Sequence, residues 1–249
     1  MRKSIRLWAV LFWLLVWQLA SLAIGSEILL VSPFRVFTTL ASLVQTSSFW
    51  RSIGFSFVRI AEGFLLGALL GCGLAALASR WRWLQELLSP LMLTVRTVPV
   101  ASFIILALIW FSSRNLSVLI SFLMVLPILY TSALQGIAHR NPALLEMSRV
   151  FHVSPLRRLR MIDLPECYPF LLSGCKSALG LSWKSGIAAE VIGIPRGSIG
   201  EHLQQAKVYL ATPELFAWTV VIVLISVGFE RLVLSLLARG MRHLRRWNG

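Results

Sequence analysis

Charged side chains inside apolar stretches are the residues of this sequence that could handle a solute. Lys184 stands beside Trp183 in a largely apolar stretch, and Lys176 precedes it by eight residues. Because an ionised group is costly in hydrocarbon, Lys184 marks a candidate contact for an anion or another polar solute. An ion pair with a carboxylate such as Glu190 or Glu62 is the alternative explanation. The candidate residues for a solute pathway are Glu62, Arg96, Trp183, Lys184 and Glu190.

Residues for catalysis are scarce. The sequence has one Asp, Asp163, and nine Glu, and no two carboxylates are spaced to meet within an apolar stretch. It contains no HExxH, no GxSxG with a distant acid and no G-x-x-x-x-G-K-[ST] phosphate-binding loop. Cys72, Cys167 and Cys175 lack the spacing of metal ligands and are interpreted as packing residues. We expect no catalytic residue, no metal and no cofactor bound by this chain, so any energy must come from elsewhere.

The composition indicates an integral membrane protein. Of the 249 residues, 57% are hydrophobic and only 14% are charged, and the mean hydropathy is +0.77. A helix needs about 20 mostly apolar residues to cross a bilayer, because hydrocarbon offers the backbone no hydrogen-bond partners. Six stretches qualify and predict an all-α polytopic protein with about six transmembrane helices, the third and fourth kinked at Pro99 and Pro127. They cover residues 7–24, 53–78, 87–111, 116–137, 168–189 and 213–237.

The first stretch is open to a second interpretation as a cleaved signal peptide, because Arg2, Lys3 and Arg6 precede it. The apolar core of a signal peptide is about 7 to 15 residues long. Residues 7–24 are 18 residues without a charge. We therefore expect a first transmembrane helix.

Basic residues between the spans predict the orientation, because Lys and Arg are retained on the cytoplasmic side. With both termini inside, fourteen Lys and Arg residues lie on the inner side, five lie outside and five fall within spans. The formal charge of +14 is thus explained by topology and by contact with anionic membrane lipids. No basic stretch alternates with exposed aromatic residues, so we expect no nucleic-acid partner.

Small residues spaced about four apart predict buried faces on the second and fifth spans. Helices in lipid associate through close van der Waals contact, which small side chains permit. Lining of a pathway is the alternative interpretation of both stripes. The stripes are Gly63, Gly67 and Gly71, and Gly174, Ala178, Ser182 and Gly186. Arg59 and Glu62, on the second span, are also spaced to pair with each other.

The longest inner segment, residues 139–165, is patterned unlike a plain connector. Asn141-Pro142 predicts the start of a helix over about 142–151, and Ser154-Pro155 predicts the start of a second short helix. An exposed apolar hinge at 151–153 would separate them and enter a groove on a partner protein; an interfacial helix on lipid headgroups is the alternative. The second helix would carry Leu156, Leu159 and Ile162 on one side and Arg157, Arg158 and Arg160 on the other.

Within this segment, Glu146-Met147-Ser148 is followed by His152 and by Ile162-Asp163-Leu164-Pro165. The spacing resembles the EAA loop of bacterial ABC importer permeases, which has Glu-Ala-Ala, a Gly at the position of His152 and a later Ile-x-Leu-Pro. The resemblance covers about residues 30–240. It includes Ser32-Pro33 at the start of an outer amphipathic helix, Arg96-Thr97-Val98-Pro99 at the break of the third span and Ala189-Glu190 at the end of the fifth. The resemblance is to the subgroup serving nitrate, sulfonates, taurine, bicarbonate or pyrimidine and thiamine precursors.

The resemblance implies a type I ABC importer permease fold, as a single permease domain over 1–249 with its core at about 50–240. Two copies would form the pathway at their interface, each docked on an ABC ATPase that binds ATP and Mg²⁺. An extracytoplasmic binding protein would deliver the solute, and the complex would lie in the bacterial plasma (inner) membrane. The residues implied in coupling to the ATPase are Glu146, Met147, Ser148, Val150, Phe151, His152, Val153, Ser154, Pro155 and Leu156.

Two other classes of function are alternatives to a permease subunit. An ATP-independent channel or secondary transporter would be supported by inverted halves with broken midplane helices, and the sequence shows no symmetry between its halves. A membrane enzyme is disfavoured because carboxylate pairs and His clusters are missing. The sequence therefore favours a transport subunit that is not itself an enzyme.

Overall fold

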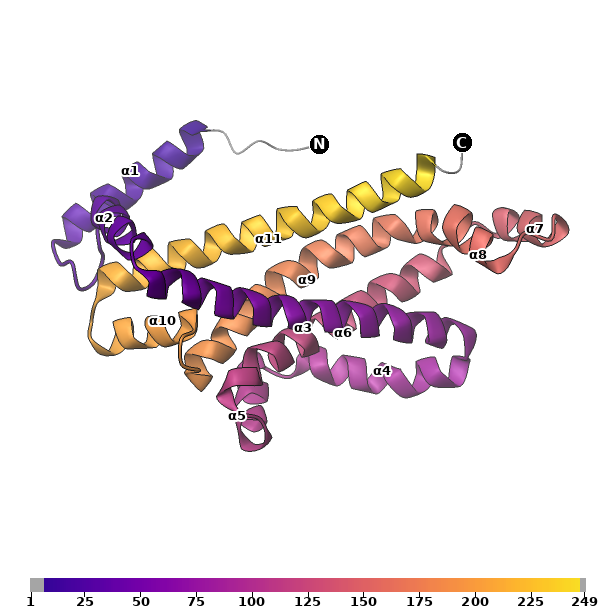
Figure 1. Ribbon diagram of the computed structural model, residues 1–249, viewed down its shortest axis with the longest axis horizontal. Helices are drawn as coiled ribbons and strands as arrows, with labels where there is room; N and C mark the ends of the chain where they lie inside the picture. The colour runs from indigo at the N-terminus through magenta and orange to yellow at the C-terminus, as the bar shows by residue number, and fades with distance from the viewer. Residues whose placement is uncertain (1–6, 247–249) are drawn as a thin grey trace.

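The computed structural model describes residues 7–246, with side chains through residue 242, and this part of the chain is helical without a strand (Figure 1). Twelve helical elements follow one another along the chain. They are α1 (Leu7–Ile24), α2 (Pro33–Val44), α3 (Ser47–Arg80), α4 (Arg82–Thr97), α5 (Val100–Trp110), α6 (Ser113–Ala138), α7 (Pro142–Val150), α8 (Pro155–Arg158), a π-helical turn (Leu159–Asp163), α9 (Leu164–Gly193), α10 (Ile199–Val208) and α11 (Thr212–Arg246).

Capping residues account for the starts of α2 and α7. The Ser32 hydroxyl accepts a hydrogen bond from the Arg35 N–H at 3.4 Å, and the Asn141 side-chain oxygen accepts one from the Ala143 N–H at 2.9 Å. In both helices a proline occupies the first turn, where its missing N–H removes no helical hydrogen bond. The predicted starts at Ser32-Pro33 and Asn141-Pro142 are confirmed.

The predicted spans coincide with long helices. Four helices, α1, α3, α6 and α11, are long and apolar enough to cross a membrane, and the bent pair α4 and α5 would make a fifth. The predicted fifth span lies inside α9, which at 30 residues has the length but not the apolar composition of those four. An all-α polytopic membrane fold is confirmed. Length and apolar composition identify four spans, or five with the bent pair, and the total of about six stays a prediction.

The predicted third span is broken at Val98-Pro99, which is a sharper change of direction than the kink expected from Pro99 alone. Between α4 and α5 the chain bends by 105°, and α5 projects away from the other helices (Figure 1). Val98 is extended, with φ −72° and ψ 132°, because the ring of Pro99 disfavours a helical residue before it. At 11 residues, α5 is about 16 Å long, too short to cross a bilayer by itself.

Helices α3, α6 and α9 form the centre of the fold, and small residues allow their close approach. A Cβ on Gly67 would lie 2.8 Å from the Val125 side chain, and a Cβ on Gly186 would lie 2.6 Å from the Ser121 hydroxyl. Gly67 is on α3, Gly186 is on α9, and both partners are on α6. The two stripes of small residues are thus covered by other helices, which supports the packing interpretation over the pathway interpretation.

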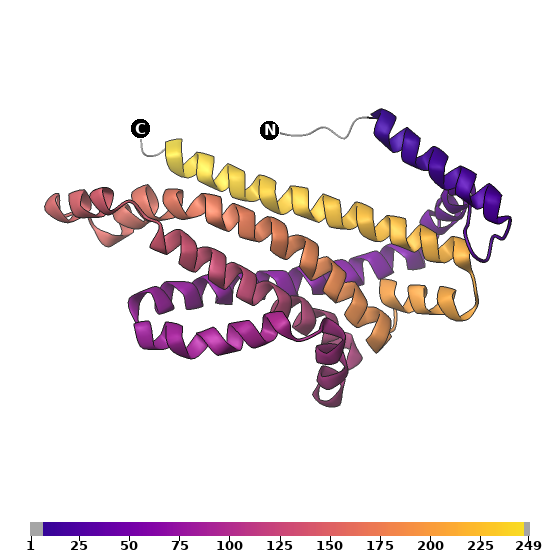
Figure 2. The same ribbon diagram turned by 180° about the vertical axis from the view of Figure 1, so that it is seen from behind.

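The two ends of the helix bundle carry different segments. Helices α7 and α8 and the C-terminal end of α11 lie at one end, whereas α2 and α10 lie at the other, in both views (Figures 1 and 2). The connection between α3 and α4, with Arg80 and Arg82, is also at the first end. Three of the segments predicted to face the cytoplasm therefore gather at this end, namely the α3–α4 connection, the segment with α7 and α8, and the end of α11. Residues 1–6, also predicted inside, lie outside the described residues.

We predict that Gly71→Val destabilises the fold, whereas Gly73→Val does not. A Cβ on Gly71 would lie 2.8 Å from the Leu126 carbonyl oxygen, a backbone atom of α6, while nothing lies within 4 Å of the corresponding position on Gly73. Overpacking of this kind costs about 1 to 3 kcal/mol. Thermal unfolding of the detergent-purified variants, followed by size-exclusion chromatography, measures the difference. Equal midpoints for the two variants would contradict close packing of α3 on α6.

Candidate functional site

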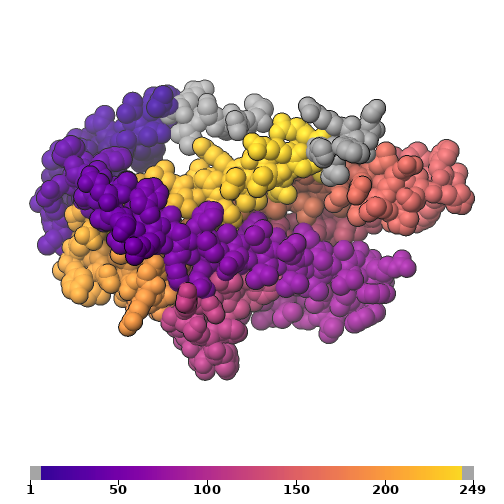
Figure 3. Space-filling view, viewed as in Figure 1, coloured from indigo at the N-terminus to yellow at the C-terminus, as the bar shows by residue number. Residues whose placement is uncertain are grey.

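The segment predicted to dock on a partner forms the outermost tip of one end of the molecule (Figure 3). Val150 and Phe151 are each 73% exposed, and Leu156 is 59% exposed. Large apolar side chains gathered at a protruding tip indicate a surface that another molecule covers. Of the ten residues implied in coupling, Ser148 is buried and Val153 is half-buried, and the other eight are exposed.

Helix α7 ends in a Schellman motif, and His152 is its left-handed residue. The Val153 N–H donates to the Ser148 carbonyl at 2.9 Å, and the His152 N–H donates to the Arg149 carbonyl at 3.1 Å. The φ of His152 is +48°, a conformation that costs a residue with a Cβ about 1 to 2 kcal/mol but costs Gly nothing. This geometry explains why the EAA pattern has Gly at this position.

Two carboxylates fix the base of the loop to the helix bundle. Asp163 has an oxygen 2.6 Å from Arg140 Nη1, and its other oxygen lies 3.4 Å from Arg158 Nε. A Glu166 oxygen accepts a hydrogen bond of 2.5 Å from the Asn141 N–H. These contacts join both ends of the segment predicted over 139–165, so the exposed tip stands on a braced base.

The predicted second short helix is not a separate element. Helix α8 continues through the π-helical turn directly into α9, without an intervening loop. Both Pro165 and Pro169 lie in the first turns of α9, and each lacks the N–H that would close an α-helical hydrogen bond four residues back. The π-helical turn at Leu159–Asp163 accommodates these missing hydrogen bonds. As a result, α8 and the predicted fifth span form one continuous helical segment.

The structure separates the intramembrane candidates Lys184, Trp183 and Glu190. Lys184 is exposed on α9, whereas Trp183 and Glu190 point into the core. The Trp183 ring packs against Phe57 and Phe229, each at 6.2 Å between centroids, so Trp183 faces the core in this conformation and its place in the pathway lining stays a prediction. No carboxylate of the described residues lies within salt-bridge distance of Lys184, and its predicted pairing with Glu190 or Glu62 is therefore absent from this structure.

Glu190 is fully buried and connects three helices. One carboxylate oxygen accepts from the Ser56 hydroxyl at 2.7 Å and from the Gly200 N–H at 3.3 Å. The Ser56 hydroxyl in turn accepts from the Ile199 N–H at 3.0 Å. Glu190 and Ser56 thereby satisfy the first N–H groups of α10, which have no partner within that helix. Glu190 therefore holds α10 against α3 and α9 in this conformation, and its place in the pathway lining stays a prediction.

Arg96 and Glu62 lie in two separate cavities. Arg96 donates to the Pro127 carbonyl at 3.0 Å and to the Thr131 hydroxyl, beside a cavity of about 290 Å³ between α4 and α6. Glu62 lines a cavity of about 400 Å³ on α3 and α6. Its predicted partner Arg59 lines the same cavity but donates to the Asn115 side chain instead, at 2.6 Å. The contact with Asn115 joins residues 56 positions apart, and sequence spacing carries no signal for it.

Metal chemistry has no support in residues 7–242. No three His, Cys, Asp or Glu side chains come together there as a metal site requires. The three cysteines are free, with Cys167 and Cys175 buried and Cys72 half-buried.

The amino-acid sequence is similar to those of known membrane transport proteins. Residues 63–243 match the family described as binding-protein-dependent transport system inner membrane component. The chain is 27% identical to a putative aliphatic sulfonates transport permease protein of Bacillus subtilis, over 85% of this chain and 77% of the relative. It is 27% identical to the taurine transport system permease protein of Escherichia coli (94% and 85%) and to a bicarbonate transport system permease protein of Synechococcus elongatus (80% and 69%).

We predict that His152→Gly stabilises the end of α7. Relief of the left-handed strain is offset by the greater freedom of Gly in the unfolded chain, which leaves a gain of about 0.5 to 1 kcal/mol. Hydrogen exchange over residues 142–156, measured by mass spectrometry, should slow about two- to fivefold. Ser154→Gly is the control, because Ser154 has φ −58° and gains no relief, so exchange there should accelerate. Slower exchange in both variants would contradict the assignment of strain to His152.

Proposed function

The chain belongs to the family of binding-protein-dependent transport system inner membrane components, and from that premise we propose that it is the pathway-forming subunit of an ABC importer. Two copies surround the pathway, each is seated on a separate ATPase that binds ATP and Mg²⁺, and an extracytoplasmic binding protein supplies the solute. The chain itself is a transport subunit and catalyses no reaction. The observation that carries this proposal is the exposed apolar tip on a braced base.

The seat for the ATPase is the exposed tip formed by the end of α7 and the start of α8. Its apolar side chains Val150, Phe151 and Leu156 offer the contact area, and Glu146 is exposed on the same short helix. The Asp163 ion pairs keep this surface in a fixed position relative to α9. A rigid apolar tip is suited to a protein groove, because a headgroup surface would not require a fixed position. We therefore favour a protein partner over lipid here.

The pathway lies along one face of α9. Ser173, Lys176, Ser177 and Lys184 are exposed there, and Gly180, between them, has no atom within 4 Å of where a Cβ would be. The spacing of three or four residues places all five on one side of the helix. Two lysines and two serines facing hydrocarbon would be costly, so this face is covered by water and by a second copy of the chain. Gly180 permits that copy to approach closely.

The transported solute is a small anion or zwitterion. Lys176 and Lys184 are the charged groups of this face, and both are cationic. Proteins similar to this chain are named for transport of aliphatic sulfonates, taurine and bicarbonate, all of which carry a negative group. An exposed ammonium group offers such a group a favourable, non-directional contact during passage.

We predict that Phe151→Asp weakens binding of the ATPase. A charge at the centre of an apolar contact should weaken it at least about tenfold, which corresponds to about 1.4 kcal/mol. Co-purification of the co-expressed ATPase with the detergent-solubilised chain is the measurement. Val208→Asp is the matched control, because Val208 is 65% exposed at the opposite end of the molecule. Undiminished co-purification with Phe151→Asp would refute the proposed seat.

We predict that Lys184→Gln lowers solute uptake about tenfold without loss of assembly. Lys184 is exposed in the single chain and forms no salt bridge with the described residues, so a reduced rate with assembly intact reports on the solute. Uptake of labelled taurine, an alkanesulfonate and bicarbonate into proteoliposomes, with the binding protein present, is compared with ATPase co-purification. Lys207→Gln removes the same charge from an exposed position on α10 and serves as the control. Equal uptake by the Lys184→Gln variant and the unmodified chain would place the pathway elsewhere.

A further inference from the structure

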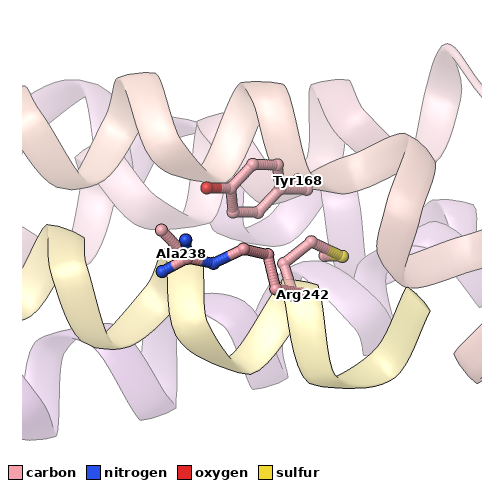
Figure 4. A pocket seen from close by; sticks show the side chains of 4 residues that line it. Tyr168, Ala238 and Arg242 are labelled. Atoms are coloured by element: carbon pink, nitrogen blue, oxygen red, sulfur yellow. The ribbon is translucent and has the colours of Figure 1, made fainter. Parts of the chain in front are cut away.

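A cavity between α9 and α11 is lined by residues that have no role in the proposed solute pathway or ATPase seat. Its volume is about 320 Å³, and Tyr168, Ala238, Met241 and Arg242 line it. Figure 4 shows Tyr168 on α9 and Arg242 on α11, with the phenol oxygen and the guanidinium turned in the same direction, toward Ala238. Two hydrogen-bond donors from different helices therefore face one space with an apolar floor.

The nearby acidic side chains are already engaged with other groups. Asp163 is paired with Arg140 and Arg158, and Glu166 accepts the Asn141 N–H. Among the described residues, no carboxylate lies within salt-bridge distance of Arg242. The cavity thus presents a cationic group whose charge the described side chains leave uncompensated.

The cavity lies at the end of the bundle that carries α7, α8 and the predicted cytoplasmic loops. It is at the level where apolar α11 gives way to its basic end, and the half-buried apolar side chain of Leu234 lies about one turn before Ala238 on the same face of the helix. A ligand here would have its polar group at Arg242 and apolar chains along α11. The inner leaflet of a plasma membrane, which is rich in anionic lipids, supplies molecules of that form.

We propose that this cavity binds the phosphate of an anionic phospholipid of the inner leaflet. The guanidinium presents paired N–H groups that match two phosphate oxygens, and the Tyr168 hydroxyl donates to a third. Ala238 and Met241 contact the glycerol and the first carbons of the acyl chains. A lipid held in this way fills the gap between the inner ends of α9 and α11.

Native mass spectrometry of the detergent-purified full chain, titrated with phosphatidylglycerol, tests the proposal. We expect Arg242→Gln to weaken binding about tenfold and Tyr168→Phe, which removes only the hydroxyl, about threefold. Arg239→Gln removes the same charge from an exposed residue of α11 outside the cavity and should leave binding within a factor of two. Phosphatidylcholine with the same acyl chains should bind more weakly than phosphatidylglycerol to the unmodified chain.

Three outcomes would overturn the proposal. Equal losses for Arg239→Gln and Arg242→Gln would show general attraction of lipid to a basic helix end. Equal binding of the two lipids would show that the guanidinium does not select a negative charge. Binding of inorganic phosphate that Arg242→Gln abolishes, with lipid binding unchanged, would assign the cavity to a free anion. Unchanged thermal midpoints of the variants establish that the fold is intact.

Discussion

Close contact between the backbones of α3, α6 and α9 is the constraint on which the rest of the structure depends. Lipid supplies no hydrophobic force between helices, so their association relies on van der Waals contact at short range. Gly67 and Gly71 on α3 and Gly186 on α9 leave no room for a side chain against α6. Because these three helices pack without space between them, the other helices pack around their outside. The polar face of α9 is therefore exposed in the single chain.

Helix α9 connects every part of the molecule to which a function is proposed. Its N-terminal end continues from α8 through the π-helical turn. Farther along the helix is Lys184, and near its C-terminal end Glu190 binds the first turn of α10. In the proposed transport cycle, a displacement of the exposed tip is therefore carried along one rod to the solute pathway and the outer end. The Asp163 ion pairs matter because they prevent the tip from moving independently of that rod.

At His152, the conformation that the turn requires is one that the residue itself disfavours. A Schellman ending requires a left-handed residue after α7, and the chain places His152 there at φ +48°. The strain is tolerated because the flanking hydrogen bonds and the braced base determine the turn independently of the residue type. The departure from Gly at this position thus changes the stability of the turn and not its path.

The sequence by itself determined the local features. The length of the apolar stretches predicted the long helices, and Asn141-Pro142 and Ser32-Pro33 predicted where two shorter ones start. The distribution of basic residues predicted that their loops lie on one side of the membrane. The sequence also pointed to residues 139–165 as the docking segment. Only the tertiary structure decided that Trp183 and Glu190 face the core while Lys184 faces out, and that the chain bends by 105° before α5. The reason is that hydropathy and capping act within a few residues, whereas the Glu190 contact with Ser56 joins positions 134 apart.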